Sequence, residues 1–381
     1  MAETSPRFLS LDVFRGMTIC FMIIVNNPGG VSYWALNHAP WHGFTPTDLV
    51  FPSFLFAVGN AMSFTMKKLE QMSNSAVLAK IFKRTIIIFL IGYLLSWFPF
   101  FDVVNGHWAF RPLSHTRIVG VLQRIALCYC FASLMIHYLS TRTVYILSAV
   151  FLVGYWVILM VFGWMNLHTF GNDIDPLSMT GNAGFYLDKW LFGEAHMYHG
   201  EGIAFEPEGI LSTMTSIVNV VIGYYVGKFI QTNGKNYTTV AKLLLTGCLF
   251  IFIAICLDPL FPMNKKLWSS SFVLITTGID MVIISFLIYS LEIQNWNWGN
   301  WARFFTIPGK NPLFIYIVSE VLLTILAWVV IAKKSLPEWV DNFWLTIAPG
   351  RFGSLLFSIS FMLVCWLVAY LLDKRKIYVR V

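Results

Sequence analysis

The chain has 381 residues, of which 57% are hydrophobic and only 12% are charged, and its mean hydropathy is +0.68. Soluble domains carry about 25% charged residues, so this composition excludes an ordinary water-soluble domain and indicates an integral membrane protein. The formal net charge of +7 does not point to nucleic acid, because the basic residues lie at the ends of apolar runs and form no single patch.

Ten apolar runs approach the length of about 20 residues that an α-helix needs to cross a bilayer. In chain order they are 13–27, 47–66, 80–98, 118–138, 143–164, 209–231, 240–257, 269–290, 312–332 and 353–372. We therefore expect an all-α fold, a polytopic transmembrane helical bundle of about ten helices that forms one domain over residues 1–381. Pro46, Pro52 and Gly59 predict a kink in the second helix.

The distribution of charge predicts the orientation of the bundle, because cytoplasmic loops are enriched in Lys and Arg. With the N-terminus inside and ten crossings, 17 basic residues fall on the cytoplasmic side and 8 outside. Both termini are therefore expected in the cytoplasm. Between the eighth and ninth runs, Trp296, Trp298 and Trp301 predict a segment at the depth of the lipid headgroups.

This orientation leaves three outer loops at about 28–46, 99–117 and 165–208. The last is long and polar, and long connections without regular structure are commonly functional. All six cysteines fall in apolar runs, with neither a zinc-binding nor a disulfide pattern. No Walker-type phosphate loop occurs in the sequence. We therefore expect no metal and no ATP-driven pump.

The first outer loop holds the densest group of residues that can carry chemistry. A Pro-Gly-Gly sequence ends the first helix, while Thr45 and Pro46 open the second as N-cap and first helical residue. His38, His42 and Asp48 should therefore lie in a tight bend near the outer surface.

Simpler explanations exist for each residue of this bend. Asp48 lies three residues after Thr45 and can close a capping box, and a lone outward-facing histidine is usually solvated. Taken together, an imidazole that accepts a proton near neutral pH, a carboxylate that orients it and an amide such as Asn27 that donates to an oxyanion are suited to acyl transfer.

A series of motifs along nearly the whole chain resembles the heparan-α-glucosaminide N-acetyltransferase family, including its bacterial NagX-type members. The motifs, in order, are Arg7 to Gly16, Asn27 to Gly30, His38 to Pro52, Gly120 to Ile125, Glu206 to Thr213, Pro262 to Ser269 and Gly309 to Leu313. Several motifs in one order are far more specific than any one of them alone.

This resemblance implies a transmembrane acetyltransferase that moves acetyl from cytosolic acetyl-CoA to the amino group of a glucosamine-type sugar on the outer side, without a metal. It implies that His38, which matches the histidine of the family's HAPW motif, is the catalytic base. Asp48 would hold the imidazole, and Asn27 would donate to the oxyanion. The residues leave open whether acetyl passes through an acetyl-histidine and whether the acceptor is an amine or a hydroxyl.

The phosphates of acetyl-CoA should be bound by cationic and amide side chains on the cytoplasmic side. The candidates are Arg15, Arg124, Lys310 and Asn311. For Arg15 and for Lys310 taken singly, ordinary positive-inside anchoring is the better explanation. Arg124 differs from these, because it lies within the fourth span, near its outer half, and must be paired, either with a ligand or with an acidic residue. The candidate acidic partners are Asp12, Glu208, Asp258, Asp280 and Glu320.

The acceptor sugar should be bound by the outer loops, through polar contacts to its hydroxyls and one aromatic face. The candidates are Trp41, His42, Glu208, Asn264 and Lys265. The lysosomal enzyme of the family has an asparagine at the position of His42. Glu208 has an alternative role as a favourable charge at a helix N-terminus.

The alternative function is a transporter of a sugar or related metabolite. A transporter predicts symmetry between the two halves and discontinuous helices in both, but the sequence has no repeat at a fixed period and only its second run is interrupted. The expected partners are the lipid bilayer and an amino-sugar or glycan acceptor, with no nucleic acid, and the family suggests a homodimer. Because no organelle signal is visible, we expect a bacterial inner membrane.

Overall fold

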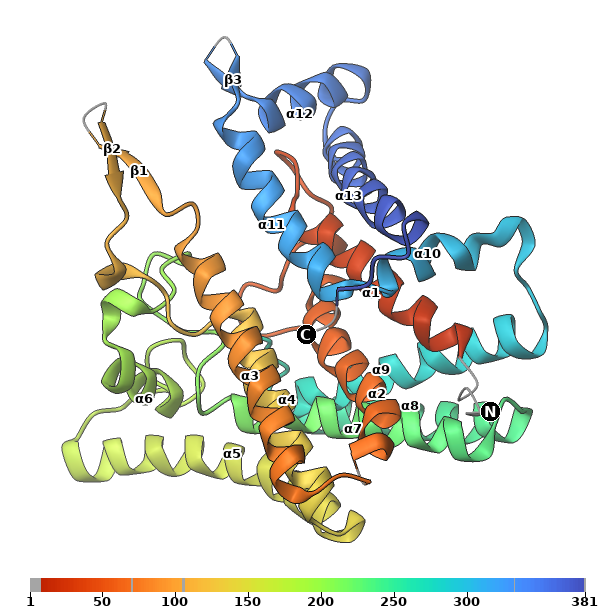
Figure 1. Cartoon of the computed structure of the whole chain (residues 1–381). Coiled ribbons are helices and arrows are strands. Elements are labelled where there is room, and N and C mark those ends of the chain that lie inside the picture. The colour runs from red at the N-terminus through yellow and green to blue at the C-terminus, as the bar shows by residue number, and fades with distance from the viewer. Residues whose placement is uncertain (1–7, 70, 105–106, 332, 380–381) are drawn as a thin grey trace.

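Each of the ten predicted spans contains a helix in the structure (Figure 1), a computed structural model that describes residues 8–69, 71–104, 107–331 and 333–379. Arg7, the first residue of the first motif, lies outside these ranges. The all-α prediction is confirmed, because the ten helices follow the predicted runs closely. They are α1 Leu9–Asn26, α2 Val50–Leu69, α3 Asn74–Trp97, α4 Val121–Tyr138, α5 Thr141–Phe170, α7 Thr213–Asn233, α8 Tyr237–Leu257, α9 Ser270–Leu287, α11 Pro312–Trp328 and α13 Arg351–Lys374.

Eight helices of the described chain are long and apolar enough to cross a membrane. The pair formed by α10 (Trp301–Gly309) and α11 qualifies as a ninth span, with a bend of 78° between its two parts. Helix α3 is long enough to cross a membrane, but it contains three charged residues, Lys80, Lys83 and Arg84, and does not qualify as apolar. The chain is thus an integral membrane protein with a number of spanning helices close to that expected.

The position of the main helix break differs from the prediction. Pro46 lies in a 3₁₀ turn, Pro46–Leu49, and Pro52 in the first turn of α2, where a missing N–H leaves no hydrogen bond unmade. The second span therefore continues without a sharp bend. The sharp bend falls at Lys310 and Asn311, between α10 and α11.

Several elements were not expected from the sequence. The outer loop 165–208 contains the end of α5 and a helix, α6 (Ala183–Phe192), which begins where Asn182 accepts a hydrogen bond from the Phe185 N–H at 2.9 Å. The other unexpected elements are two small hairpins, β1 Phe101–Val104 with β2 His107–Phe110 and β3 Val330–Ile331 with β4 Lys334–Ser335, and the helix α12 Leu336–Ile347. Strand β3 lies in the predicted run 312–332, because α11 ends earlier than expected, at Trp328.

The core is formed where α1, α2, α4, α7 and α9 meet, and it surrounds the fully buried Trp268. Helix α2 packs along α7, and α8 packs along α9. Two glycines allow the backbones of α2 and α7 to come close. An added Cβ at Gly59 would lie 2.0 Å from the Val220 carbonyl oxygen, and one at Gly223 would lie 2.2 Å from the Phe56 carbonyl oxygen. Small residues permit such backbone contact between membrane helices.

We expect Gly223→Ala to destabilise the protein by roughly 1–3 kcal/mol, since the new methyl group would force α2 and α7 apart. The measurement is the thermal unfolding midpoint in detergent. Gly154→Ala in α5 is the matched control, because nothing lies within 4 Å of its added Cβ. Equal midpoints for the two variants would contradict this view of the α2–α7 contact.

Candidate functional site

His38 and Asp48 form a hydrogen-bonded pair at the bend between the first two spans. The Nδ1 of His38 lies 2.7 Å from Oδ1 of Asp48. Because a carboxylate only accepts, this contact places the imidazole proton on Nδ1 and leaves the lone pair on Nε2. The Asp48 side chain is 1% exposed and that of His38 is 42% exposed, so a buried carboxylate orients an accessible base.

Asp48 is also a structural residue, as its position after Thr45 predicted. Its second oxygen, Oδ2, accepts hydrogen bonds from the N–H groups of Ala39 at 3.1 Å and Thr45 at 3.0 Å, and the capping box is complete. The Thr45 hydroxyl donates to the carbonyl of Asn37 at 2.7 Å. The same carboxylate therefore closes the helix start, holds the loop of His38 and orients the imidazole.

Lys265 lies against the other side of this pair, in the connection between α8 and α9. Its Nζ is 3.2 Å from Nδ1 and 3.1 Å from Nε2 of His38. Burial lowers the pKa of Lys265, and the neighbouring Lys266 lowers it further, whereas Asp48 and Glu208 oppose this. The sequence motif predicted Lys265 for the substrate, and the structure brings it directly to the predicted base.

Two cavities meet at His38, Lys265 and Glu208, which line both of them. The outer cavity, of about 200 Å³, is polar and is lined also by Arg117, Glu201 and Lys266 among others. The inner cavity, of about 70 Å³, extends between α1, α2, α4 and α11 and is mostly apolar. Its lining includes Val25, Asn26, Phe51, Phe54, Ile125 and Tyr316.

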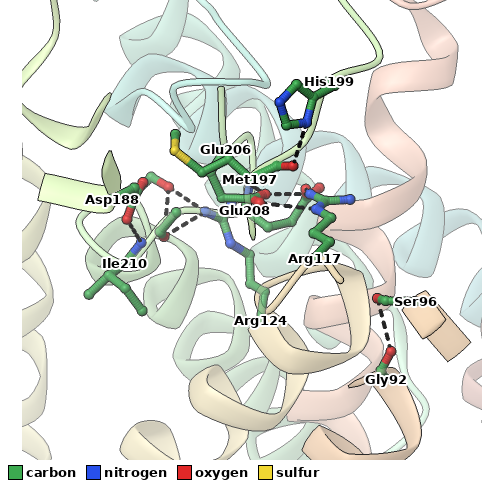
Figure 2. Close-up of polar contacts among 12 residues, drawn as sticks. Gly92, Ser96, Arg117, Arg124, Asp188, Met197, His199, Glu206, Glu208 and Ile210 are labelled. Carbon is green, nitrogen blue, oxygen red and sulfur yellow. Dashed lines mark hydrogen bonds and ion pairs between the residues drawn. The ribbon is translucent and has the colours of Figure 1, made fainter. Parts of the chain in front are cut away.

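Arg117 binds two buried carboxylates just before the N-terminal end of α4 (Figure 2). Its guanidinium donates to both Glu206 and Glu208, including a 3.0 Å bond from Nε to Glu206, and its Cζ lies 4.9 Å from the Tyr198 ring centre. Asp188 of α6 accepts from the Ile210 N–H at 2.9 Å. Helix α6 therefore helps to hold the segment that carries both glutamates.

The electrostatic states of these acids differ. Burial raises the pKa of Glu206 to about 7, despite the hydrogen bond and charge of Arg117. Glu208 is also buried, but the combined charges of Arg117, Arg124 and Lys265 hold its pKa below its usual range. Burial raises the pKa of Asp188 to about 6. Glu208 is thus the ionised carboxylate that faces both cavities.

Arg124 is fully buried beside this cluster and contacts protein groups. It donates to the Gly209 carbonyl oxygen at 3.0 Å and to the Ser212 hydroxyl, and its Cζ lies 4.9 Å from the Trp268 ring centre. Its Nε and Nη1 have no hydrogen-bond partner among the described residues. The structure places Arg124 near Glu208, and not beside the other basic residues predicted for acetyl-CoA.

The predicted oxyanion donor does not line the cavity. The side-chain amide of Asn27 donates to the Ile23 carbonyl oxygen at 2.7 Å. The backbone carbonyl of Asn27 accepts from the Ser358 hydroxyl at 2.8 Å. The preceding residue, Asn26, lines the inner cavity instead. A helix advances about 100° per residue, so neighbouring positions face different directions.

Three predicted substrate residues hold the outer loops together. Trp41 donates through Nε1 to the Leu177 carbonyl oxygen at 2.8 Å, which ties the first loop to the loop of α6. Asn264 is fully buried and accepts from the Leu267 N–H at 2.8 Å, while its amide nitrogen lies 3.4 Å from Nδ1 of His42. None of Trp41, His42 and Asn264 lines either cavity.

The remaining candidates for binding acetyl-CoA lie in other parts of the bundle and have protein partners. Arg15 is ion-paired with Asp12 in the first turns of α1. Lys310 is paired with Asp373 at 2.6 Å, and Asn311 hydrogen-bonds the backbone of Ile377 at 3.0 Å. Lys310 and Asn311 thus attach the bend between α10 and α11 to the end of α13 and the segment after it.

Arg117 was not singled out from the sequence, although it precedes the fourth run directly. The signal for it was the Glu206-Pro207-Glu208 sequence, since two acids at the start of one apolar run require a cation once they are buried. Within the described chain, no group of three or more His, Cys, Asp or Glu side chains is arranged to hold a metal ion.

Residues 7–180 match the family model described as heparan-alpha-glucosaminide N-acetyltransferase, catalytic. Proteins of that name from Homo sapiens and Mus musculus are 29% identical over 370 residues and 28% identical over 373 residues. Each alignment covers 84% of this chain and 54% of the relative, so the chain spans about half the length of these curated relatives. The model match includes His38, Asp48 and Arg117, whereas Glu208 and Lys265 lie beyond it.

We expect Arg117→Ala to destabilise the protein by about 3–5 kcal/mol, because it leaves the charge of a buried carboxylate unpaired. The measurement is again the unfolding midpoint in detergent. Arg111→Ala is the matched control: its partner Asp102 is 47% exposed, and such a surface pair contributes only about 0–1 kcal/mol. A loss no larger for Arg117→Ala than for Arg111→Ala would argue against this cluster.

Asp188 should make stability depend on pH in a definite direction. Its pKa is raised in the folded state from 3.8 to about 6, so its contribution is fully present below about pH 4 and is lost as pH rises through about 6. Asp188→Asn keeps an acceptor for Ile210 and should make the unfolding midpoint depend less on pH across this window, while the dependence due to Glu206 stays. The exposed Asp173→Asn should leave the wild-type profile unchanged, and an unchanged profile in Asp188→Asn would refute the assignment.

Proposed function

Because this chain is similar to the heparan-α-glucosaminide N-acetyltransferase family over residues 7–180 and to relatives of that name over most of its length, we propose that it is a membrane acetyltransferase that uses acetyl-CoA and an amino sugar of the glucosamine type. The observation that carries this proposal is the position of the His38–Asp48 pair where a polar outer cavity meets an apolar inner one. A base at such a junction can contact an acceptor from one side and an acyl donor from the other.

The proposed chemistry follows from the geometry of the pair. Nε2 of His38 removes a proton from the acceptor amine, and Asp48 stabilises the imidazolium that forms. The amine nitrogen attacks the thioester carbonyl carbon, so a C–N bond forms as the C–S bond breaks. The imidazolium returns its proton to the departing thiolate, and an acceptor that arrives as an ammonium first loses its additional proton to water. Direct transfer and an acetyl-histidine intermediate both use this arrangement.

Lys265 and Glu208 complete the proposed centre. When protonated, the Lys265 amine beside His38 would stabilise the oxyanion of the tetrahedral state, a role first predicted for Asn27. The carboxylate of Glu208 faces both cavities and would attract a cationic amino group of the acceptor. The apolar lining of the inner cavity, including Val25 and Phe54, suits an acetyl thioester.

The rest of the acetyl-CoA site and the topology remain part of the proposal. Arg15 and Lys310 would attract phosphates from the predicted cytoplasmic side if their pairs with Asp12 and Asp373 opened. Acetyl would then cross the bundle while CoA and sugar stay on opposite sides. A homodimer and a bacterial inner membrane stay predictions from the resemblance and the sequence.

The first test is transfer of radiolabelled acetyl from acetyl-CoA to glucosamine by purified protein in proteoliposomes. His38→Ala should lower the rate about 100-fold or more, which is the usual contribution of a general base. The matched control is His137→Ala, at the far end of α4, which contacts Asn74 and no cavity and should keep the wild-type rate. Unfolding midpoints of all variants show whether the fold is retained.

The transporter alternative keeps one observation in its favour, the 78° bend between α10 and α11. Discontinuous helices often border the binding sites of transporters. The same proteoliposomes distinguish the two functions. Glucosamine uptake without acetyl-CoA, together with no acetylated sugar and no effect of His38→Ala, would overturn the acetyltransferase proposal.

A further inference from the structure

A large groove lies on the bundle where α5, α7, α8 and α9 meet, and it shares no lining residue with the cavities at His38. Its volume is about 720 Å³ and its lining is mainly apolar, with Leu152, Val218, Phe250 and Leu274 among the residues. Figure 1 shows these helices together in the lower part of the molecule. Helices α5 and α8 are its least covered walls, since only 22% and 17% of their most apolar stretches are buried.

One end of the groove is polar and basic. Lys242 and Thr246 of α8 and the paired rings of Tyr145 and Tyr225, whose centres are 4.7 Å apart, line this end. Lys242 is exposed and makes no ion pair among the described residues. Arg142 lies one turn before Tyr145 on the same face of α5, so a second cation is close to the same end.

The length of the groove matches one half of a bilayer. On α7 the lining runs from Val218 to Phe229, which are separated by eleven helical steps. At 1.5 Å per residue this is about 16 Å. Half of the hydrocarbon core is about 15 Å thick. The polar end lies at the termini of α7 and α8 that the charge bias places in the cytoplasm, where anionic lipids are enriched.

We propose that this groove binds one anionic phospholipid of the bilayer. Its phosphate lies at Lys242, its glycerol region lies beside the hydroxyls of Tyr145 and Tyr225, and its acyl chains follow Leu152, Val218 and their neighbours towards the membrane centre. Basic pockets between helices on the cytoplasmic side recognise lipid headgroups in this way. The proposal is independent of acetyl transfer, because it uses none of the residues around His38.

The test is binding of phosphatidylglycerol and phosphatidylcholine to delipidated protein, titrated separately and counted by native mass spectrometry. Wild type should bind one phosphatidylglycerol more tightly than phosphatidylcholine. Lys242→Gln should weaken phosphatidylglycerol by about fivefold, the effect of one interfacial cation, and leave phosphatidylcholine unchanged. Ala149→Phe, which fills the groove without changing charge, should weaken both lipids.

Lys68→Gln is the matched control, since it removes an exposed lysine at the end of α2 outside the groove and should change neither affinity. Equal binding of the two lipids by wild type, or no response to either groove variant, would overturn the proposal. Displacement of phosphatidylglycerol by inorganic phosphate would identify a free-anion site instead. A change from dimer to monomer in Ala149→Phe with unaltered lipid binding would show that a second copy covers the groove.

Discussion

The buried carboxylate of Asp48 is the constraint on which the arrangement of the site depends. A charge that is removed from water is stable only where hydrogen bonds replace its hydration. Asp48 obtains them from the Ala39 and Thr45 amides and from His38. Because these donors come from the bend between two spans, satisfying one carboxylate also determines the path of that bend and the direction of the imidazole.

The other buried charges near the cavities follow the same rule over a longer distance. Arg117 precedes α4, whereas Glu206 and Glu208 precede α7, so their pairing joins two spans at one end of the bundle. Lys265, from the connection before α9, adds a cation between Asp48 and Glu208. Four connections that are distant in sequence therefore meet because their charges compensate one another where water is excluded.

The interior around His38 is divided into a polar outer cavity and an apolar inner cavity, so the two sides of the site differ in chemistry. The outer cavity is lined by charged residues of the loops, and the inner cavity by side chains of the spans themselves. Three residues, His38, Lys265 and Glu208, belong to both. The bend of 78° at Lys310 and Asn311 is attached to the end of α13, and one of the two helices that meet there, α11, contributes Tyr316 to the inner cavity.

The sequence by itself determined the membrane class, the ten helices and the pairing of His38 with Asp48. Hydrophobic length specifies a span, and residues ten positions apart around a capped turn have little freedom to separate. Only the tertiary structure decided that Asn26 and not Asn27 faces the cavity, that Arg117 neutralises Glu206 and Glu208, and that Lys265 reaches the imidazole. It also decided that Lys310 and Asn311 hold the C-terminal segment. These outcomes depend on helix rotation and on contacts between distant segments, which hydrophobic patterns and local spacing do not encode.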